Sequence, residues 1–589
     1  MRALLSPRRF WFLYIVLFVL FCLVIYQIFQ LTWLHQSSLL ALAHRQHYLT
    51  IDVSPLRGPI TDRNGKEFVT NLKIPSIYAV PRALKDEERA NLSREIAKIL
   101  GLSPKWVMDR LSRDKSFVWL KRRVTFDEAE KIRKLECPEL GVLEEYKRFY
   151  PQGTMLAQVL GFSTVDNQGV EGLERSMDGD LRGKPGKRVT QRDAKGREIK
   201  AFEMKSLPVI DGNRVVLTID QHLQYLTEKA LEQAFKQWNA KGAWAIVMDP
   251  KTGEILAMAN QPGFDPNHYA GVGPDAKRNR AITDMYEPGS VFKIVAASGA
   301  LNDGTVTPET VINCENGKWN YGFKVLHDVH PYGMLPMMEV IVKSSNIGTV
   351  KIALKMGAQK FQSYVKGFGF GAGTGIDLAG EARGYTRPPS QWSKTSPYNI
   401  PMGQEVMVTS LQMVTAMSVI ANGGYLVRPY IVAKVLDPAG VTIKEKKPII
   451  KQRVIRSETA ATMREILTQV VERGTGTKAK IPDVLVGGKT GTAQKILPGG
   501  KGYSHSEFMS SFVGFAPADN PRYAMVVVLD EARPLYYGGT VAAPVFKEVL
   551  GAALLTQGAQ PYHESAPPIT PEQVAATADL AADDPVDSY

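Results

Sequence analysis

The N-terminal apolar run constrains this chain more than any other feature, because a water-soluble domain cannot expose so many adjacent apolar side chains. Residues 10–29 are interrupted only by Gln27, and Arg2, Arg8 and Arg9 precede them. A helix of about 20 apolar residues crosses a hydrocarbon core of ~30 Å. Because positively charged flanks stay in the cytoplasm, we expect the rest of the chain on the opposite side of the membrane.

The alternative for this run is a cleaved signal peptide, since Ala41-Leu42-Ala43 resembles a cleavage site. Signal peptides carry an apolar core of about 7–15 residues, which is shorter than this run. We therefore favour an uncleaved anchor, and a single one, because no second apolar stretch approaches the ~18 residues of a span. The expected order is a cytoplasmic arm, a transmembrane helix and a linker, over residues 1–9, 10–32 and 33–56.

Length and composition indicate a globular protein of two or three domains, since 589 residues exceed a single compact core. The net charge of +13 favours contact with an anionic membrane or an acidic polymer. Nucleic acid is not indicated, because no zinc-finger spacing or RNA-recognition signature accompanies the charge. Three cysteines are too few for a disulfide scaffold, and the pairing of Cys137 and Cys314 stays open.

Strand and helix patterns beyond the span predict an α+β fold. Strands followed by helices, and then by more strands and a terminal helix, favour an antiparallel sheet flanked by helices. The expected strands lie at residues 76–80, 214–220, 243–248, 254–259, 484–486, 511–515 and 523–529. The expected helices lie at residues 87–100, 126–135, 337–342, 350–354 and 545–555, with one ending near Trp238 and helical segments from Ser290 to beyond Gly348. Residues 557–589 are rich in Pro, Ala and Asp, which predicts a disordered tail.

The pattern Ser-x-x-Lys places a hydroxyl and an amine on one face of a helical turn, where a buried lysine can act as a base. It occurs at Ser112–Lys115, Ser290–Lys293 and Ser363–Lys366. The first copy lies in a charged stretch and the third precedes a glycine-rich loop, so both lysines are expected in solvent. Only Lys293 has apolar neighbours, and Pro288-Gly289 would place Ser290 at a helix start with free N–H groups. We therefore predict that Ser290 is the nucleophile.

Two further motifs follow in order. Ser344-Ser345-Asn346 interrupts a helical pattern, so a turn there would aim Ser344 and Asn346 into one cleft. Lys489-Thr490-Gly491-Thr492 follows a strand-like segment, and its cation and hydroxyls suit a substrate carboxylate. The other Lys-Thr-Gly copy, at Lys251, occupies a predicted hairpin turn, where a turn role suffices.

The three motifs together resemble those of the penicillin-recognising serine transferases, which include penicillin-binding proteins and serine β-lactamases. Residues 57–65, 148–153 and 169–174 resemble motifs of the non-catalytic pedestal of class B penicillin-binding proteins, although in physical terms they are turn and salt-bridge segments. The resemblance implies an elongated α/β pedestal domain at 57–214 and a transpeptidase domain at 215–556. The glycosyltransferase domain of class A is not expected, because the linker is too short to hold one.

This resemblance implies a D,D-transpeptidase that cross-links peptidoglycan stem peptides through an acyl-enzyme. Ser290 would attack the carbonyl between the two terminal D-alanines, and Lys293 would be the base. Ser344 would relay a proton to the leaving D-alanine, with electrostatic support from Lys489. Asn346 would hold the peptide amide.

The implied substrate-binding residues are Thr490, Gly491 and Thr492. The two threonines would grip the terminal carboxylate, and the backbone N–H groups of Ser290 and Thr492 would form the oxyanion hole. β-Lactams would acylate the same serine. No cofactor and no metal are indicated: His327-Asp328-Val329-His330 lacks a third ligand cluster, and residues 367–373 fail the nucleotide-loop spacing.

Within class B, the short arm and single anchor resemble the cell-division, FtsI-type enzymes of Gram-negative bacteria. That likeness implies a periplasmic catalytic domain at the septum, and as partners an FtsW-type polymerase of the SEDS family and other divisome membrane proteins. The nearest alternative is an elongation-type class B transpeptidase. A catalytically weak divisome scaffold is harder to exclude, whereas a penicillin-sensing receptor would need a cytoplasmic output domain.

Overall fold

The computed structural model describes residues 7–34, 48–115, 117–192, 198–322, 324–497, 499–500 and 502–557. The chain divides into two compact units, Met1–Leu56 with Gly183–Gly212 and Arg57–Arg182 with Asn213–Tyr589. Most of the tail expected to be disordered lies outside the described residues; its first residue, Gln557, ends a helix.

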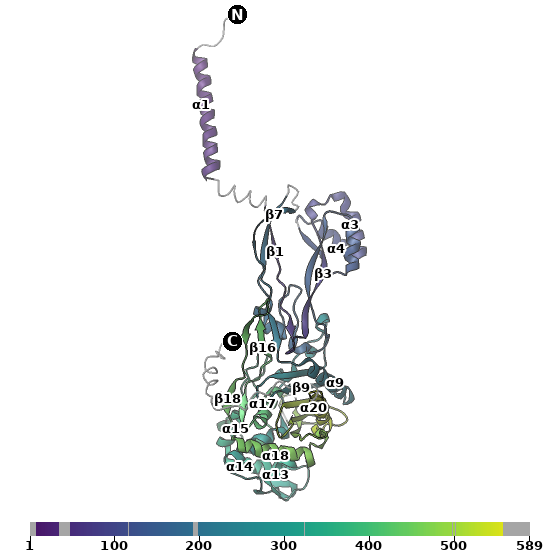
Figure 1. Ribbon diagram of the computed structural model, residues 1–589, viewed down its shortest axis with the longest axis vertical. Coiled ribbons are helices and arrows are strands. Elements are labelled where there is room, and N and C mark those ends of the chain that lie inside the picture. Colours follow the sequence, from purple (N-terminus) through teal and green to yellow (C-terminus); the bar gives the residue numbers. More distant parts are fainter. Residues whose placement is uncertain are drawn as a thin grey trace. The chain divides into compact units, whose positions relative to one another are not determined.

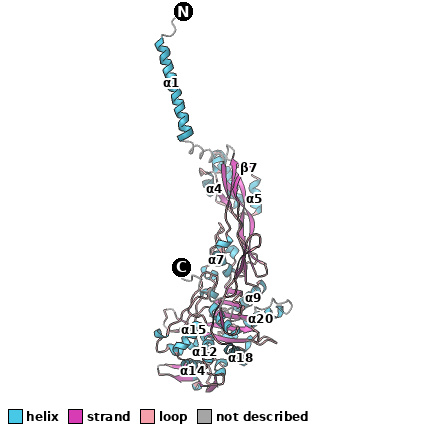
Figure 2. Cartoon of the chain, turned by 60° about the vertical axis from the view of Figure 1, so that its left-hand side comes forward, coloured by secondary structure: helices cyan, strands magenta, loops and turns pink. Residues whose placement is uncertain are grey.

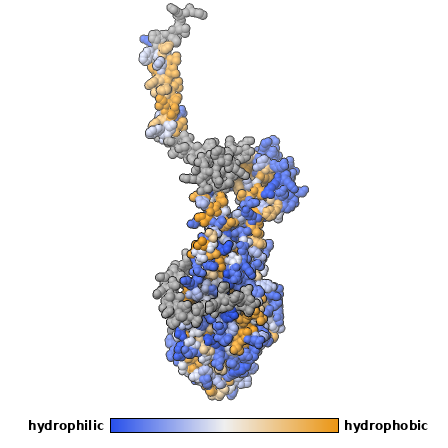
Figure 3. Space-filling model, in the orientation of Figure 1, coloured by the Kyte–Doolittle hydropathy of each residue, from blue (hydrophilic) through white to orange (hydrophobic). Residues whose placement is uncertain are grey.

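The first unit contains the expected apolar helix, α1 (Pro7–Phe29), which continues as a π-helical turn, η1 (Gln30–Leu34). The helix Phe10–Trp33 is long and apolar enough to cross a membrane, and none of its most apolar stretch is buried inside the protein. Figure 3 shows this helix as a hydrophobic surface along most of its length. An exposed apolar helix of this length fits a membrane anchor whose side chains contact lipid. The protein is therefore membrane-anchored.

Three antiparallel strands complete the first unit. They are β1 (Tyr48–Val53), β6 (Gly186–Arg192) and β7 (Glu198–Leu207), in the order β1-β6-β7. Tyr48 pairs with Gln191 and Val53 with Gly186. Part of the segment expected to be a linker is thus a strand, whose partner comes from more than 130 positions later in the sequence, beyond the reach of a local pattern.

The second unit contains a five-stranded antiparallel sheet in the order β10-β9-β21-β20-β19. Its strands are β9 (Gly242–Met248), β10 (Ile255–Gln261), β19 (Gly487–Ile496), β20 (Tyr503–Ala516) and β21 (Tyr523–Asp530). Helices α9 (Gln221–Gln237) and α20 (Ala543–Gln557) cover one face, and α12 (Lys293–Asn302), α17 (Ser410–Ala421) and α18 (Ser457–Arg473) lie on the other. Figure 1 shows β9 of this sheet next to helices α9 and α20. In Figure 2, helices α9, α18 and α20 lie next to the strands of this sheet. The expected sandwich is confirmed.

Alternation within β9 shows why both faces are covered. Trp244 and Ile246 enter the core beneath α12 and α17, whereas Ala245 and Val247 enter the core beneath α9 and α20. All seven residues of the strand are buried. A strand buried on both faces is a continuous apolar run, and β9 has that composition.

Helix α20 belongs to a second apolar segment, Gly538–Thr556, which is long enough to cross a membrane but is half buried in the protein. The expectation that no second stretch has that length is therefore wrong. Phe546 and Leu550 are fully buried against the sheet, and Leu555 is 81% exposed. Packing on the sheet accounts for the apolar face of α20, so its composition does not require a second span.

A larger mixed sheet lies elsewhere in the second unit. Its strands are ordered β17 (Thr442–Glu445), β16 (Val432–Leu436), β8 (Arg214–Leu217), β2 (Ile60–Thr61), β3 (Glu67–Ala79) and β4 (Val118–Lys121), and β5 (Leu140–Phe149) also pairs with β3. Only β2 and β8 are parallel among these pairs of described strands. The expected helices appear as α3 (Asp86–Leu100) and α5 (Phe126–Arg133), with α4 (Pro104–Leu111) between them. The sheet unites strands from both sides of the expected 214/215 division.

A buried ion cluster connects the three pedestal-like motifs. The carboxylate of Glu174 forms ion pairs with Nε of Arg57 and with Nε of Arg148, each at 2.6 Å. Arg57 also forms an ion pair with Asp178 at 2.7 Å. Glu174 is fully buried, Arg57 is 1% exposed and Arg148 is 4% exposed. These motifs therefore act structurally, as salt-bridge segments.

Shorter elements fill the remaining connections. They are η2 (Pro81–Ala83), α6 (Ala157–Leu160), α7 (Gly172–Ser176), α8 (Asp178–Leu181), η3 (Pro266–His268), α10 (Pro274–Lys277), α11 (Arg280–Thr283), η4 (Gly289–Phe292), β11 (Val311–Asn313), η5 (Glu315–Gly317), β12 (Lys318–Asn320), β13 (Val325–His327), β14 (Met334–Pro336), α13 (Met337–Val342), α14 (Asn346–Met356), α15 (Ala358–Gly367), η6 (Pro389–Gln391), α16 (Ser396–Asn399), η7 (Ile400–Met402), β15 (Tyr425–Val427), β18 (Ile450–Arg453), η8 (Thr477–Ala479) and α19 (Gly538–Val541). Two expectations are wrong. Strands β11–β14 interrupt the helical region expected after Ser290, and residues 484–486 precede β19 instead of forming a strand.

Candidate active site

Ser290 lies in the first turn of the helical segment that continues as α12, as the Pro-Gly pair before it predicted. Gly289 has φ of 58°, a left-handed conformation that glycine adopts without cost, and the 3-10 turn η4 starts there. Ser290 is half-buried and Lys293 is fully buried. The lysines of the other two Ser-x-x-Lys copies, Lys115 and Lys366, are exposed, so only one copy combines a nucleophile with a buried amine.

Lys293 reaches the second motif. Its Nζ donates to the carbonyl oxygen of Ser344 at 2.7 Å and to Oδ1 of Asn346 at 2.7 Å, and it lies 3.3 Å from Oγ of Ser344. In addition, Nζ of Lys489 donates to Oγ of Ser344 at 2.8 Å. The structure therefore brings four of the predicted catalytic side chains into one hydrogen-bonded cluster.

The turn expected between two helices supports this cluster. Ser344 has φ of 61°, which is rare for a residue with a side chain and costs about 1–3 kcal/mol. Ser345 is the N-cap of α14, and its hydroxyl accepts from the N–H of Gly348 at 2.9 Å. The strained turn ends α13 and starts α14 within three residues, so Ser344 and Asn346 both face Lys293.

Burial favours the neutral form of Lys293 and Lys489. It lowers the pKa of Lys293 from its ordinary value to about 7, and the negative charge of Asp328 opposes this change. Burial also lowers the pKa of Lys489 well below its ordinary value, and the positive charge of Lys293 adds to that shift. Two fully buried amines around one hydroxyl disfavour double protonation, so a neutral lysine is available near neutral pH.

Asp328 was missed as a functional residue. Its carboxylate accepts from Oγ of Ser345 at 2.5 Å and from the backbone N–H groups of Asn346 and Ile347. An anion at the first turn of α14 satisfies donors that a helix start leaves free. No local capping pattern in the sequence indicates Asp328, because it lies 17 residues before the N-cap.

The third motif lies within β19, the edge strand of the five-stranded sheet, not after a strand as expected. Lys489 is fully buried, and Oγ of Thr490 lies 2.7 Å from Oγ of Thr475. The hydroxyl of Thr492 accepts from the N–H of Gly538 at 3.1 Å, which leaves its own proton free to donate.

Gly491 allows β19 to approach the nucleophile turn. A Cβ at this position would lie 2.4 Å from Oγ of Ser511, 2.9 Å from Cγ1 of Val291 and 3.0 Å from the carbonyl oxygen of Pro288. Only glycine fits such a space without displacing the strand. The turn before Ser290 and the strand carrying Thr492 are thus in direct contact.

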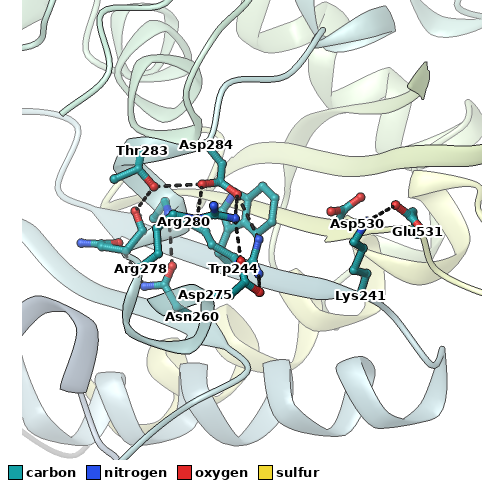
Figure 4. A network of polar contacts seen from close by, with 12 residues as sticks. Lys241, Trp244, Asn260, Asp275, Arg278, Arg280, Thr283, Asp284, Asp530 and Glu531 are labelled. Carbon is teal, nitrogen blue, oxygen red and sulfur yellow. Dashed lines mark hydrogen bonds and ion pairs between the residues drawn. The ribbon is translucent and has the colours of Figure 1, made fainter. Parts of the chain in front are cut away.

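A charged cavity of about 400 Å³ lies beside the end of β19. Figure 4 shows its charged side chains in contact with one another: Arg280 pairs with Asp275 and Asp284, and Lys241 pairs with Glu531. Lys495, which also lines the cavity, contacts Asp530 at 2.8 Å. These ion pairs hold the end of the sheet together, whereas the carboxylate of Glu287, which also lines the cavity, leaves one oxygen without a hydrogen-bond partner among the described residues.

Among the described residues, no group of three or more His, Cys, Asp or Glu side chains comes together. The arrangement suits nucleophilic acyl transfer, with a serine at a helix start, a buried amine, a second hydroxyl between two lysines, and an edge strand for an extended substrate.

Comparisons with known proteins agree with this chemistry. Residues 243–551 match the penicillin-binding protein transpeptidase domain, and residues 52–217 match the penicillin-binding protein dimerisation domain. Stage V sporulation protein D of Bacillus subtilis is 35% identical over 541 residues, covering 89% of this chain and 82% of its own length. Peptidoglycan D,D-transpeptidase FtsI of Escherichia coli is 34% identical over 516 residues, covering 86% of this chain and 85% of its own.

A solved structure gives the same family. Penicillin-binding protein 3 of Mycobacterium tuberculosis, complexed with aztreonam, superposes with a TM-score of 0.68 at 30% identity, covering 88% of this chain and 99% of its own. The two family matches together extend over residues 52–217 and 243–551. By its motifs, its fold and these relatives, the chain belongs to the class B penicillin-binding proteins and is a peptidoglycan D,D-transpeptidase.

Proposed function

We propose that this transpeptidase cross-links septal peptidoglycan during cell division through an acyl-enzyme on Ser290. The observation that carries the proposal is the fully buried Lys293, whose amine contacts Ser344 and Asn346 and has a pKa lowered to about 7. A neutral amine one helical turn from a serine hydroxyl can accept its proton.

In the acylation step, Oγ of Ser290 forms a bond to the carbonyl carbon between the two terminal D-alanines of a donor stem peptide. Its proton passes to Nζ of Lys293. Collapse of the tetrahedral intermediate breaks the C–N bond, and the leaving D-alanine amine takes a proton from Ser344. Lys489, which donates to that hydroxyl, stabilises the oxygen as the proton leaves. Ser344 is reprotonated from the lysine that holds the proton of Ser290.

The remaining site residues bind the donor. Oδ1 of Asn346 accepts a hydrogen bond from Lys293, and its amide group donates one hydrogen to the carbonyl oxygen of His327. The second amide hydrogen is therefore available for a substrate carbonyl. The hydroxyls of Thr490 and Thr492 take the terminal carboxylate. The backbone N–H groups of Ser290 and Thr492 stabilise the oxyanion, a contribution typically worth about 10²–10³ in rate per donor.

Deacylation uses the amine of a second stem peptide, which attacks the Ser290 ester and restores the hydroxyl. This order gives ping-pong kinetics. β-Lactam antibiotics acylate the same serine, but the opened ring remains attached, so no amine product departs to make room for the acceptor.

The membrane anchor determines where this chemistry occurs. We assign residues 1–9 to a cytoplasmic arm, 10–32 to the transmembrane helix and 33–56 to a linker that includes β1. We assign the pedestal to 57–214 and the transpeptidase domain to 215–556, both on the periplasmic side. Arg8 and Arg9 precede the apolar helix, which supports a cytoplasmic N-terminus. An enzyme held at the membrane receives glycan strands from a neighbour at high effective concentration. That neighbour is an FtsW-type polymerase of the SEDS family, within the division machinery.

Reconstitution with lipid-linked precursor tests this division of labour. The purified full-length protein alone should make no glycan polymer, whereas addition of the division polymerase should yield cross-linked strands. Polymer made by this protein alone would refute the proposal. If a protein lacking residues 1–56 cross-linked the partner's polymer equally well, the anchoring argument would fail. Recruitment to the lateral wall instead of the septum would favour the elongation-type alternative.

A further inference from the structure

Glu287, three residues before Ser290, is a buried carboxylate that the mechanism above does not use. It is 6% exposed. No ion pair to its carboxylate is formed among the described residues, and the neighbouring charge that acts on it is that of Glu405, which is also negative. Its Oε1 accepts from the N–H of Glu405 at 2.8 Å and from the hydroxyl of Tyr503 at 3.2 Å, whereas Oε2 is buried with no hydrogen-bond partner in the described structure. Burying a carboxylate in this way is costly, so its retention calls for a physical reason.

The first bond belongs to a ladder that supports the residues before Ser290. Tyr286 and Val408 exchange both backbone hydrogen bonds at 3.0 Å, and the N–H of Gly289 donates to the carbonyl of Gly403 at 3.1 Å. The segments 286–289 and 403–408 therefore run side by side in opposite directions. Between these two attachment points, the side chain of Glu287 takes the place of a backbone acceptor for Glu405.

The backbone of this ladder is tightly constrained. A Cβ at Gly403 would lie 2.2 Å from the carbonyl oxygen of Gly289, and Gly403 has φ of 82°. Glu405 itself has φ of 61°, a strained conformation for a residue with a side chain. The hydrogen bond from its N–H to Glu287 compensates for this strain, so loss of the carboxylate would release the segment that supports the nucleophile turn.

The second bond connects the same carboxylate to the strand pair that carries the third motif. Tyr503 is the first residue of β20 and pairs with Ile496 at the end of β19. On the other side of the contact, a Cβ at Gly289 would lie 3.3 Å from the carbonyl oxygen of Thr492. One carboxylate oxygen thus holds the turn before Ser290 and the hairpin containing Thr492 together.

We propose that Glu287 is a positioning residue that keeps the backbone N–H groups of Ser290 and Thr492 in register as one oxyanion hole. Its side chain contacts Glu405 and Tyr503, and it acts through the 403–408 segment and the β19–β20 hairpin. This inference deepens the proposed function and rests on Ser290 being the acylated residue.

The test measures acylation of the full-length protein by a fluorescent penicillin over a range of concentrations, which separates the limiting acylation rate from the dissociation constant of the noncovalent complex. For Glu287→Ala we expect a limiting rate about 10–100-fold lower with little change in the dissociation constant, because small misplacement of reacting groups costs up to about 10²-fold. Glu287→Gln keeps an oxygen that accepts both bonds and should remain within about 3-fold of wild type.

Glu228 provides a matched control. It is a second largely enclosed glutamate on α9, it accepts from the N–H of Leu156 at 2.7 Å and from Nε2 of Gln224 at 2.7 Å, and burial raises its pKa to about 7, as it does for Glu287. Glu228→Ala removes a comparable carboxylate outside the catalytic cluster, so the limiting rate should stay at the wild-type value.

Each outcome decides the matter. An unchanged limiting rate in Glu287→Ala, an equal loss in Glu228→Ala, or a Glu287→Gln variant as impaired as Glu287→Ala would each overturn the proposal. If Glu287→Ala does not fold, Tyr503→Phe removes one bond only and should lower the limiting rate by about 3–10-fold; an unchanged rate there would also overturn it. Failure of the proposed function is a separate result, because the wild-type protein itself would then not be acylated on Ser290.

Discussion

Glu174→Gln removes the charge at the centre of the buried ion cluster and tests the structural interpretation of the pedestal-like motifs. The carboxylate is fully buried and receives Arg57 and Arg148 at 2.6 Å each. After the substitution, Arg57 keeps Asp178 at 2.7 Å as a counter-charge. Arg148 keeps only the carbonyl of Arg57 and Oδ1 of Asn71, both at 3.3 Å, and its Nη2 already lacks a partner.

One buried guanidinium is therefore left without a counter-charge. Removing one partner of a buried ion pair typically costs about 3–5 kcal/mol. The glutamine oxygen can still accept one hydrogen bond, so we expect the lower part of that range, about 3 kcal/mol in the free energy of unfolding.

Urea unfolding of the full-length protein measures this loss, followed by a probe of the second unit such as tryptophan fluorescence. The matched control is Glu130→Gln, whose carboxylate is 55% exposed and pairs with Arg133 at 3.3 Å along α5. Exposed pairs of this type contribute about 0.3–0.5 kcal/mol. A Glu174→Gln protein within about 1 kcal/mol of wild type, or no less stable than Glu130→Gln, would show that the cluster is not a structural centre.

Three further predictions concern the buried lysine. The acylation rate should rise with pH through about 7 and then level off, because the pKa of Lys293 is lowered to about 7 and the neutral amine is the base; a flat profile would contradict this. Asp328→Asn should move this rise of the acylation rate to lower pH, since the charge of Asp328 raises the pKa of Lys293. A shift to higher pH would contradict the assignment of Lys293 as the base. Lys293→Ala should slow acylation by about 10²–10⁴-fold, whereas Lys115→Ala and Lys366→Ala should react as wild type does, and equal small effects from all three would place the base elsewhere.

Local patterns were sufficient where the physical cause is local. Apolar neighbours distinguished Lys293 from the lysines of the other two Ser-x-x-Lys copies, and the structure buries only that one. The broken helical pattern around Ser344 correctly indicated a turn, because a strained turn must interrupt the periodicity on both sides.

Features that depend on distant partners could not be predicted. Strand β1 has a partner after residue 185, so the segment resembled a linker. Asp328 caps a helix that begins 18 residues later, and Glu287 acts on a segment more than 110 positions away. The strand expected at residues 484–486 begins instead at Gly487 and contains the third motif. The glycines at the start of β19 lower the strand propensity of this segment, so the sequence pattern did not indicate it.

Mass spectrometry of the penicillin-treated full-length protein tests whether Ser290 forms the acyl-enzyme. We expect a single penicilloyl ester on the peptide that contains Ser290, and no ester in the Ser290→Ala protein. An adduct on Ser112 or Ser363, or labelling that survives Ser290→Ala, would contradict this expectation.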